Sequence, residues 1–365
     1  NTSDRQYDMK SNSYFYQGYC AAKLNNNNAA FLLKDFIRKY PIHSYVPQAY
    51  FEVAKFYYYK KQYKRSLENF KEIDERKIPK EDLAEYYFKK GYAYLVDGDS
   101  DEAKSLLREA RKYEGPYQQK AIYYLAHVAY EDQQYIAALE DFLILKDAKE
   151  YASVVPFYIT QIYFIQKDYD TVIALAPELL EKSADKAELN RIIALSYYNL
   201  DKYNQALPYF NKYIELNNTN HSSTTIDTTE ATRNNNYAIG YTFYKTQNYS
   251  NAVEYLTQTV GKEDALSQNA YYVMGDCYLK LQKLSLATQS FFEASKKDYI
   301  PEIKEDALYN YAKLQYETAA VPFKSAISAL ENYIQQYPHS TRSAEATEYL
   351  ATIYASTRNY EEAVK

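Results

Sequence analysis

The chain has 365 residues and a formal net charge of −5, and it contains 47 Tyr and no Trp. Such a charge gives no overall attraction to nucleic acid or anionic lipid, and the sequence has no run of about 18 apolar residues that could cross a membrane. Because the length exceeds the roughly 250–300 residues over which one compact core keeps growing, an elongated array or several domains are expected.

Small residues recur along the whole chain with a regular period. They return every 34 to 39 positions, with one longer step of 46, and a second small residue usually follows 12 positions later. A period of this length is typical of stacked units that cannot bury their apolar faces alone. The ten repeats have their first small residue at Gly18, Ala54, Gly91, Ala126, Thr160, Ala194, Gly240, Gly275, Ala312 and Ala351.

Repeat three, residues 83–110, shows most clearly what one unit should look like. Apolar and small side chains recur at spacings of four and three on both sides of a polar turn, 97–100, which is the pattern of two amphipathic helices. Small residues at Gly91 and Ala103 would let the two helix backbones approach closely. The segment therefore predicts an antiparallel helix hairpin.

These spacings resemble the tetratricopeptide repeat, whose pattern is W-x2-L-G-x2-Y, then A-x3-F, then A and P. Tyr replaces Trp wherever that position is aromatic. The resemblance covers about nine complete repeats and part of a tenth, and it implies an all-α, right-handed superhelical α-solenoid. Repeat eight carries the pattern as Tyr271, Met274, Gly275, Tyr278, Ala287, Phe291 and Ala294.

Two places depart from the regular array. Repeat five has Thr160 and Val172 at the small positions, so we expect the stack to be loosened or bent there. The polar segment 217–233 is predicted to be an inter-repeat loop, either a tolerated surface insertion or a hinge. Repeats one to six then span 1–216 and repeats seven to ten span 234–365, in one continuous solenoid.

The C-terminal end falls inside the second helix of repeat ten. A solenoid normally ends in a capping element with a polar outer face. We therefore expect the chain to be part of a longer protein.

Catalytic chemistry is not indicated by any motif. The sequence has no nucleophile motif and no phosphate-binding loop, and its few His and Cys residues lie in separate repeats rather than at metal-ligand spacing. We expect no enzymatic activity, no cofactor and no metal. The scattered residues are His43, His127, His221, His339, Cys20 and Cys277.

The run 55–65 interleaves basic and aromatic residues, as single-strand nucleic-acid sites do. Its Tyr57 and Tyr63 fall on template positions of the repeat. We therefore interpret the run as a solvated helix face and expect no nucleic-acid partner.

Aromatic side chains gather at three positions of the first helices. The resemblance implies that these positions project into the inner concave surface, and the leading one is aromatic in eight of the nine complete repeats. Tyr and Phe offer contact area at low entropy cost. The alternative is that the rings pack between neighbouring first helices. The predicted partner groove consists of Phe51, Tyr58, Phe88, Tyr92, Tyr123, Tyr130, Phe157, Phe164, Tyr198, Tyr237, Tyr241, Tyr244, Tyr272, Tyr309 and Tyr316.

The resemblance and the groove together predict a non-catalytic scaffold that binds a protein or peptide segment, without inserting into a membrane. The alternatives are an accessory repeat domain of a larger enzyme or signalling protein, and a glycan-binding module. Two sequences, 36–44 and 333–340, are similar to the F-x3-YP-x-S pattern of bacterial envelope repeat proteins. This similarity favours a periplasmic or outer-membrane-associated bacterial protein, with the cytoplasm as the alternative.

Overall fold

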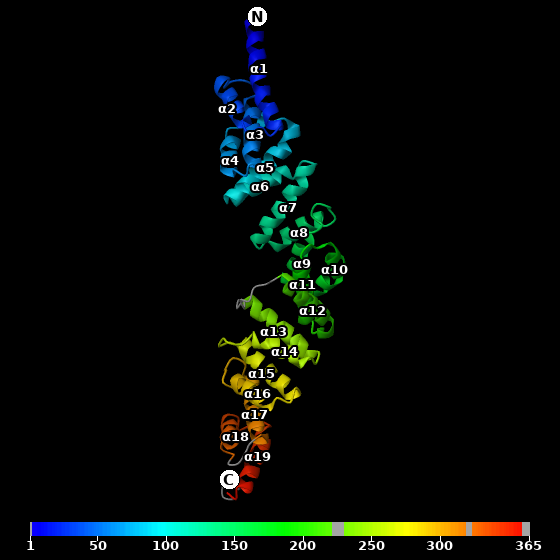
Figure 1. The fold of residues 1–365 in the computed structure, drawn as a ribbon, viewed down its shortest axis with the longest axis vertical. Helices are drawn as coiled ribbons and strands as arrows, with labels where there is room; N and C mark the ends of the chain where they lie inside the picture. Colours follow the sequence, from blue (N-terminus) through cyan, green and yellow to red (C-terminus); the bar gives the residue numbers. More distant parts are fainter. Residues whose placement is uncertain (1, 221–229, 319–322, 360–365) are drawn as a thin grey trace. The chain divides into compact units, whose positions relative to one another are not determined.

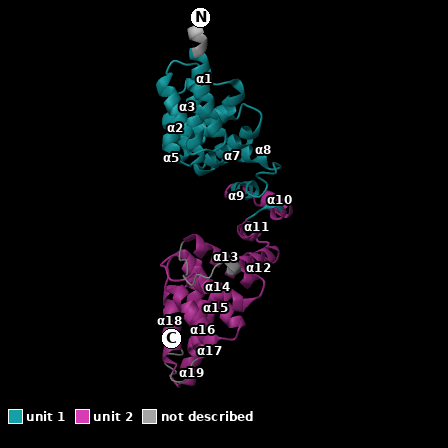
Figure 2. Ribbon diagram, turned by 45° about the horizontal axis from the view of Figure 1, so that its top comes forward, with its two compact units in different colours: residues 1–162, 182–184 teal, residues 163–181, 185–365 magenta. Residues whose placement is uncertain are grey.

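The computed structural model describes residues 2–220, 230–318 and 323–359, and this part of the chain is all helical (Figure 1). By contacts, the chain divides into two compact units, which Figure 2 shows in different colours. Unit 1 comprises residues 1–162 and 182–184, and unit 2 comprises residues 163–181 and 185–365. The division passes through repeat five, where the sequence departs most from the repeat pattern.

In unit 1 the helices form hairpins in chain order. Two short 3-10 helices, Glu75–Lys77 and Lys80–Asp82, connect the second hairpin to the third. The α-helices are α1 (Thr2–Lys23), α2 (Ala29–Lys39), α3 (Val46–Tyr59), α4 (Tyr63–Lys71), α5 (Leu83–Asp97), α6 (Ser100–Ala110), α7 (Pro116–Glu131) and α8 (Tyr135–Leu145).

The division between the units falls on α9 (Val155–Ile165) and α10 (Tyr169–Lys182). The hairpin pattern continues through the described part of unit 2. Its helices are α11 (Lys186–Asn199), α12 (Tyr203–Asn220), α13 (Glu230–Lys245), α14 (Tyr249–Thr257), α15 (Ala265–Lys280), α16 (Leu284–Ser295), α17 (Pro301–Glu317), α18 (Lys324–Gln336) and α19 (Ser343–Ser356).

The small residues of the period lie where the two helices of each hairpin meet. Gly91 on α5 faces α6, and a Cβ atom there would lie 3.1 Å from Leu106 and Leu107. The small partner in that hairpin, Ala103, is completely buried. In repeat two, the small partner is Ser66, whose buried hydroxyl donates a hydrogen bond of 2.8 Å to the backbone oxygen of Ala54. The two helices of these hairpins thus approach each other closely at small residues 12 positions apart, as the sequence predicts.

Large apolar side chains fill the remaining space within each unit. In unit 1, Phe36, Phe70 and Leu107 on second helices are fully buried. In unit 2, Phe210 and Leu256 belong to a core cluster that joins several successive hairpins. Each hairpin therefore buries its apolar stripe against its neighbour, as expected for an all-α solenoid.

The predicted polar loop 217–233 has helical ends. Helix α12 reaches Asn220 and α13 begins at Glu230, while 221–229 lies outside the described residues. Helix α13 thus begins before the predicted end of the loop at 233. Arg233 in its first turn is buried and hydrogen-bonded within unit 2, which holds this turn in place.

Candidate protein-binding surface

A cavity of about 520 Å³ opens on unit 1 beside three successive first helices. Its wall comes from α1, α3 and α5 and from the residues that directly follow α1 and α3. The resemblance predicts the partner surface on these first helices. The lining residues are Ala22, Lys23, Asn25, Glu52, Lys55, Phe56, Tyr59, Lys60 and Glu85.

A chain of opposite charges links the three helices along this cavity. The Nζ atom of Lys55 lies 2.7 Å from Glu52 on its own helix and 3.6 Å from Glu85 on α5. Lys23 on α1 reaches Glu52 at 3.3 Å, and Lys89 reaches Glu85 at 2.5 Å. The side chains of Lys55 and Lys89 are only 7% and 3% exposed. Since a buried charge is costly unless it is paired, these residues hold one another in place.

The opposite charges shift the pKa values of Glu85 and Lys23. Burial alone would raise the pKa of Glu85, but Lys55 and Lys89 hold it below its ordinary value. Burial likewise would lower the pKa of Lys23, and the neighbouring Glu52 raises it above its ordinary value. In both groups, the neighbouring opposite charge favours the ionised form.

Tyr59 forms an exposed aromatic edge of the cavity. Its hydroxyl accepts a hydrogen bond of 2.6 Å from Lys89, and the same ammonium lies 3.9 Å from the centre of its ring. This geometry is a cation–π contact. A partner can therefore meet a side chain that is exposed yet already held in position.

Three residues of the predicted aromatic groove lie in the core, so the prediction is wrong for Phe51, Phe88 and Tyr309. Phe51 packs its ring 6.1 Å from that of Phe70 on the second helix of the same hairpin. Tyr309 packs in the same way against Tyr333, at 5.4 Å. At Phe51 and Tyr309 the leading position thus faces the second helix of its own hairpin, and Phe88 lies in a core cluster with Leu107 of α6.

Other predicted rings contact the next repeat. Within unit 1, the rings of Tyr58 and Tyr92 lie 5.7 Å apart, and the Tyr130 hydroxyl donates to Gln161 at 2.6 Å. Within unit 2, Tyr244 donates to Asp276 at 2.7 Å. In all three pairs, the third groove position of one repeat meets the middle position of the next. These contacts favour the alternative interpretation, packing between first helices.

The predicted groove residues outside the core keep part of their surface. None of the fifteen predicted residues lines the cavity of unit 1. A binding role for the exposed ring edges therefore stays a prediction. The half-buried members are Tyr58, Tyr92, Tyr123, Tyr130, Phe157, Phe164, Tyr198, Tyr237, Tyr241, Tyr244, Tyr272 and Tyr316.

The sequence interpretation missed the charged wall of the cavity. It assigned the charges of the run 55–65 to a solvated face, but Lys55 is buried. A usable signal was present, because Glu52 and Lys55 are three positions apart and Glu85 and Lys89 are four apart. Such pairs meet on one helix face, and they recur on consecutive first helices.

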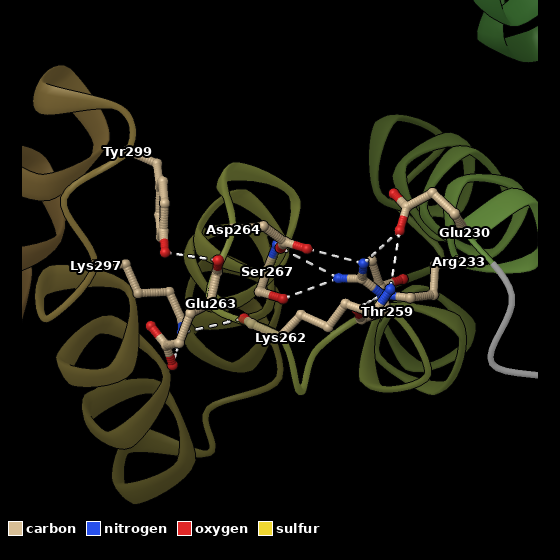
Figure 3. A network of polar contacts seen from close by, with 9 residues as sticks. All are labelled: Glu230, Arg233, Thr259, Lys262, Glu263, Asp264, Ser267, Lys297 and Tyr299. Carbon is tan, nitrogen blue, oxygen red and sulfur yellow. Dashed lines mark hydrogen bonds and ion pairs between the residues drawn. The ribbon is translucent and has the colours of Figure 1, made fainter.

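Unit 2 contains a second polar network, centred on Arg233 (Figure 3). This guanidinium donates to the backbone oxygen of Thr259 at 3.0 Å, to Asp264 at 2.8 Å and to Ser267 at 3.1 Å. Hydrogen bonding to Arg233 lowers the pKa of Asp264 to about 2. The network joins the start of α13 to the turn after α14 and to the start of α15.

The next turn of unit 2 is held by similar contacts. Lys297 lies 2.7 Å from Glu263, and the hydroxyl of Tyr299 donates to the backbone oxygen of Glu263 at 2.6 Å (Figure 3). Both sets of contacts combine an ion pair with a hydrogen bond to a backbone oxygen in the turn between α14 and α15. Their arrangement indicates a structural role.

Within residues 2–220, 230–318 and 323–359, no group of three or more His, Cys, Asp and Glu side chains is placed to hold a metal ion. No helix in this part of the chain combines the length and apolar character needed to span a membrane.

Comparison with known families places the chain in the tetratricopeptide-repeat family. Three family models described as tetratricopeptide repeat match it. The first matches 237–300, the second 84–113 and 189–220, and the third 12–41 and 306–340. The predicted class, an all-α solenoid of tetratricopeptide hairpins, is thereby confirmed.

Three solved structures are similar to the chain at low sequence identity. MamA AMB-1 is 20% identical, with 49% of this chain and 94% of that chain covered and a TM-score of 0.42. A tetratricopeptide repeat protein from Parabacteroides merdae is 13% identical, with 83% and 99% covered and a TM-score of 0.41. The tetratricopeptide domain of P58(IPK) is 14% identical, with 96% and 99% covered and a TM-score of 0.27. No curated protein matches the chain.

Proposed function

We propose that the chain is a non-catalytic scaffold, and that the first-helix face of unit 1 binds a segment of a protein partner. The observation that carries this proposal is the cavity of about 520 Å³ beside the first helices of repeats one to three. Binding a partner protein is the general role of tetratricopeptide repeats. The assignment to this face of unit 1 is our own.

The charged wall supports this assignment because it is ordered before a partner arrives. Lys55 and Lys89 are already fixed by Glu52 and Glu85. Immobilising a long side chain on binding costs roughly 0.5–1.5 kcal/mol. A surface whose side chains are already held avoids much of that cost.

The half-buried rings extend the proposed surface along unit 1. Tyr92 packs against Tyr58 and Tyr124 and keeps part of its surface accessible. A ring held on its sides offers an edge and a hydroxyl to a peptide backbone. We therefore include the exposed edges of Tyr58, Tyr92 and Tyr123 in the proposed surface.

An envelope location is a separate proposal that rests on the sequence similarity alone. Pro41 is the second residue after α2 and Pro338 is the second residue after α18, so each lies in a turn between two hairpins. Pro is favoured after a helix end because it cannot continue the helix. Fractionation of the native host, followed by detection of the chain in the periplasmic and membrane fractions, tests this location.

Site-specific photo-crosslinking tests the proposed surface. A benzophenone amino acid is placed at Tyr59, which is 63% exposed on the cavity rim, and in a matched variant at Phe31, which is 73% exposed on the second helix α2. We expect irradiation in native extract to give a protein adduct at position 59 that is several-fold stronger than any adduct at position 31. Equal labelling at both positions, or labelling at position 31 alone, would contradict the proposal.

A further inference from the structure

The run 55–65 is the most basic stretch associated with the cavity. Five of its eleven residues are Lys or Arg and none is acidic, although the whole chain carries a net charge of −5. The run extends from α3 through the hairpin turn to the start of α4. Its charge is therefore a local feature of unit 1.

Residues of this run line two cavities. Lys55, Phe56, Tyr59 and Lys60 contribute to the cavity described above. A second cavity, also of about 520 Å³, is formed by the turn after α3, the start of α4 and the end of α5. Its lining residues are Lys61, Gln62, Tyr63, Lys64, Arg65, Val96 and Asp97.

The exposed cations of the run have weak or uncharged partners. Lys60 donates to the amide oxygen of Asn27 at 3.1 Å, and Arg65 donates to that of Gln62 at 3.0 Å. Lys64, whose side chain is 86% exposed, lies 3.9 Å from Asp97. Their positive charge is therefore available to an incoming carboxylate, unlike that of the buried Lys55 and Lys89.

The rings of the run favour a protein over a single-stranded nucleic acid. Base stacking needs a free aromatic face. The ring of Tyr58 is surrounded by Tyr59, Tyr63 and Tyr92 in edge contacts. One face of Tyr59 is covered by the ammonium of Lys89 at 3.9 Å. The charges are thus exposed, whereas the ring of Tyr58 and one face of Tyr59 already contact other side chains.

We propose that the basic surface, residues 55–65 of unit 1, binds an acidic segment of a protein partner. Side-chain carboxylates of Asp or Glu in that segment pair with Lys60, Lys64 and Arg65. Opposite charges of this kind speed association and select the partner. This inference rests on the proposed function, because the basic surface begins at Lys55 and Lys60 in the wall of the proposed cavity and continues through the hairpin turn to the start of α4.

A labelled peptide tests the inference on the full chain. The probe is a short fluorescent peptide in which Glu alternates with Gly and Ser, and its C-terminus is amidated. We expect fluorescence anisotropy to show salt-dependent binding, and no binding by the same peptide with Gln in place of Glu. The combined variant Lys60→Gln, Lys64→Gln, Arg65→Gln should bind about tenfold more weakly, since three solvent-exposed contacts of modest strength are removed.

A matched variant controls for the change in net charge. Lys280→Gln, Lys283→Gln and Lys296→Gln remove three exposed cations from unit 2, and this variant should bind the peptide like the unaltered chain. Circular dichroism and thermal melting establish that both variants are folded. Equal weakening by the two variants, or equal binding of the Gln peptide, would overturn the inference.

Two further probes separate the competing ligands. Tighter binding of single-stranded oligothymidylate than of the acidic peptide would overturn the inference in favour of nucleic acid. A peptide with a free C-terminus should bind like the amidated one, and a requirement for the free carboxylate would overturn recognition of side chains. If crosslinking at position 59 succeeds while the acidic peptide fails, only the acidic chemistry is rejected. Failure of both experiments rejects the proposed function as well.

Discussion

Single polar residues hold neighbouring repeats of unit 2 together. The side chain of Arg233 is 4% exposed, and Asp264, its carboxylate partner, is 32% exposed. A guanidinium buried to this extent would be strongly destabilising without partners. The backbone oxygen of Thr259 and the hydroxyl of Ser267 complete its hydrogen bonding. Arg233 therefore stabilises the junction of α13, α14 and α15.

We expect Arg233→Ala to lower the free energy of unfolding by about 2–3 kcal/mol. The loss of one partner leaves buried acceptors unpaired, and the partial exposure of Asp264 moderates the effect. Urea denaturation of the full chain measures the change. Arg108→Ala removes an exposed Arg from α6 and serves as the control. A similar effect of the two substitutions would contradict the structural role of Arg233.

The low pKa of Asp264 predicts how stability depends on pH. A carboxyl group with a pKa of about 2 in the folded chain and about 3.9 in the unfolded chain stabilises the fold above the higher value. This contribution is lost as the pH falls from about 4 to 2. We expect the melting temperature to drop over that range, and Asp264→Asn to reduce the drop. An unchanged pH profile in the variant would show that Asp264 is not responsible.

At the scale of the helix hairpin, the turns repeat one backbone feature. In the nine repeats where it is described, the residue seven positions after the first small residue has a positive φ. Gly occupies this place only in repeat three, at Gly98. The other residues are Asn25, Lys61, Gln133, Lys167, Asp201, Gln247, Gln282 and Arg358. Because non-Gly residues adopt this conformation at a cost, the tertiary contacts of the hairpin impose the turn.

Exchanging the turn residues should change stability in opposite directions. Gly98→Ala places a side chain at φ 93°, where space is open but the backbone is unfavourable, and should lower the free energy of unfolding by about 1 kcal/mol. Gln282→Gly relieves the same cost at φ 57° and should raise the free energy of unfolding by only a few tenths of a kcal/mol, because the greater freedom of the unfolded chain offsets part of the gain. Chemical denaturation measures the free energy of unfolding of both variants. A higher value for Gly98→Ala than for the unaltered chain would contradict the prediction.

The close contact inside each hairpin predicts a second element-scale effect. A Cβ atom at Gly275 would lie 2.7 Å from the buried ring of Phe291, whereas one at Gly91 would lie 3.1 Å from two Leu side chains. We expect Gly275→Ala to destabilise the chain by about 1–3 kcal/mol through overpacking, and Gly91→Ala to cost less. The melting temperatures of the two variants show which substitution is more destabilising, and a larger loss for Gly91→Ala would contradict the prediction.

At the scale of the whole molecule, the chain consists of two compact units. In repeat arrays, stability is approximately a sum of terms for each repeat and for its contacts with its neighbours. A destabilising change in one repeat should therefore affect nearby repeats most. The position of a substitution along the chain should then decide which helices lose protection of their backbone amides against hydrogen exchange.

Hydrogen exchange measures this local response. In the Gly275→Ala variant, we expect faster exchange of backbone amides in α15, α16 and α17 of unit 2. Exchange in α3 to α6 of unit 1 should match that of the unaltered chain. If the amides of both units exchange faster to the same degree, the chain unfolds as a single cooperative structure instead.

Much of the fold could be predicted from the sequence, because a hairpin depends on contacts that are close along the chain. Gly91 and Ala103 are 12 residues apart, and their small size directly permits two helices to approach. The groove was predicted less well. A side chain one position away from the buried stripe can face its own second helix, the next repeat or solvent. The ring of Phe51 faces the second helix of its own hairpin, and the ring of Tyr58 faces the next repeat.

The sequence by itself determined the repeat period, the helical class and the place where the pattern weakens, at Thr160 and Val172. Only the tertiary structure decided which charges meet. Lys55 and Glu85 are 30 positions apart and pair because α3 and α5 lie side by side. The physical reason is that periodicity depends on local geometry, whereas the burial of a charge depends on partners that only neighbouring repeats supply.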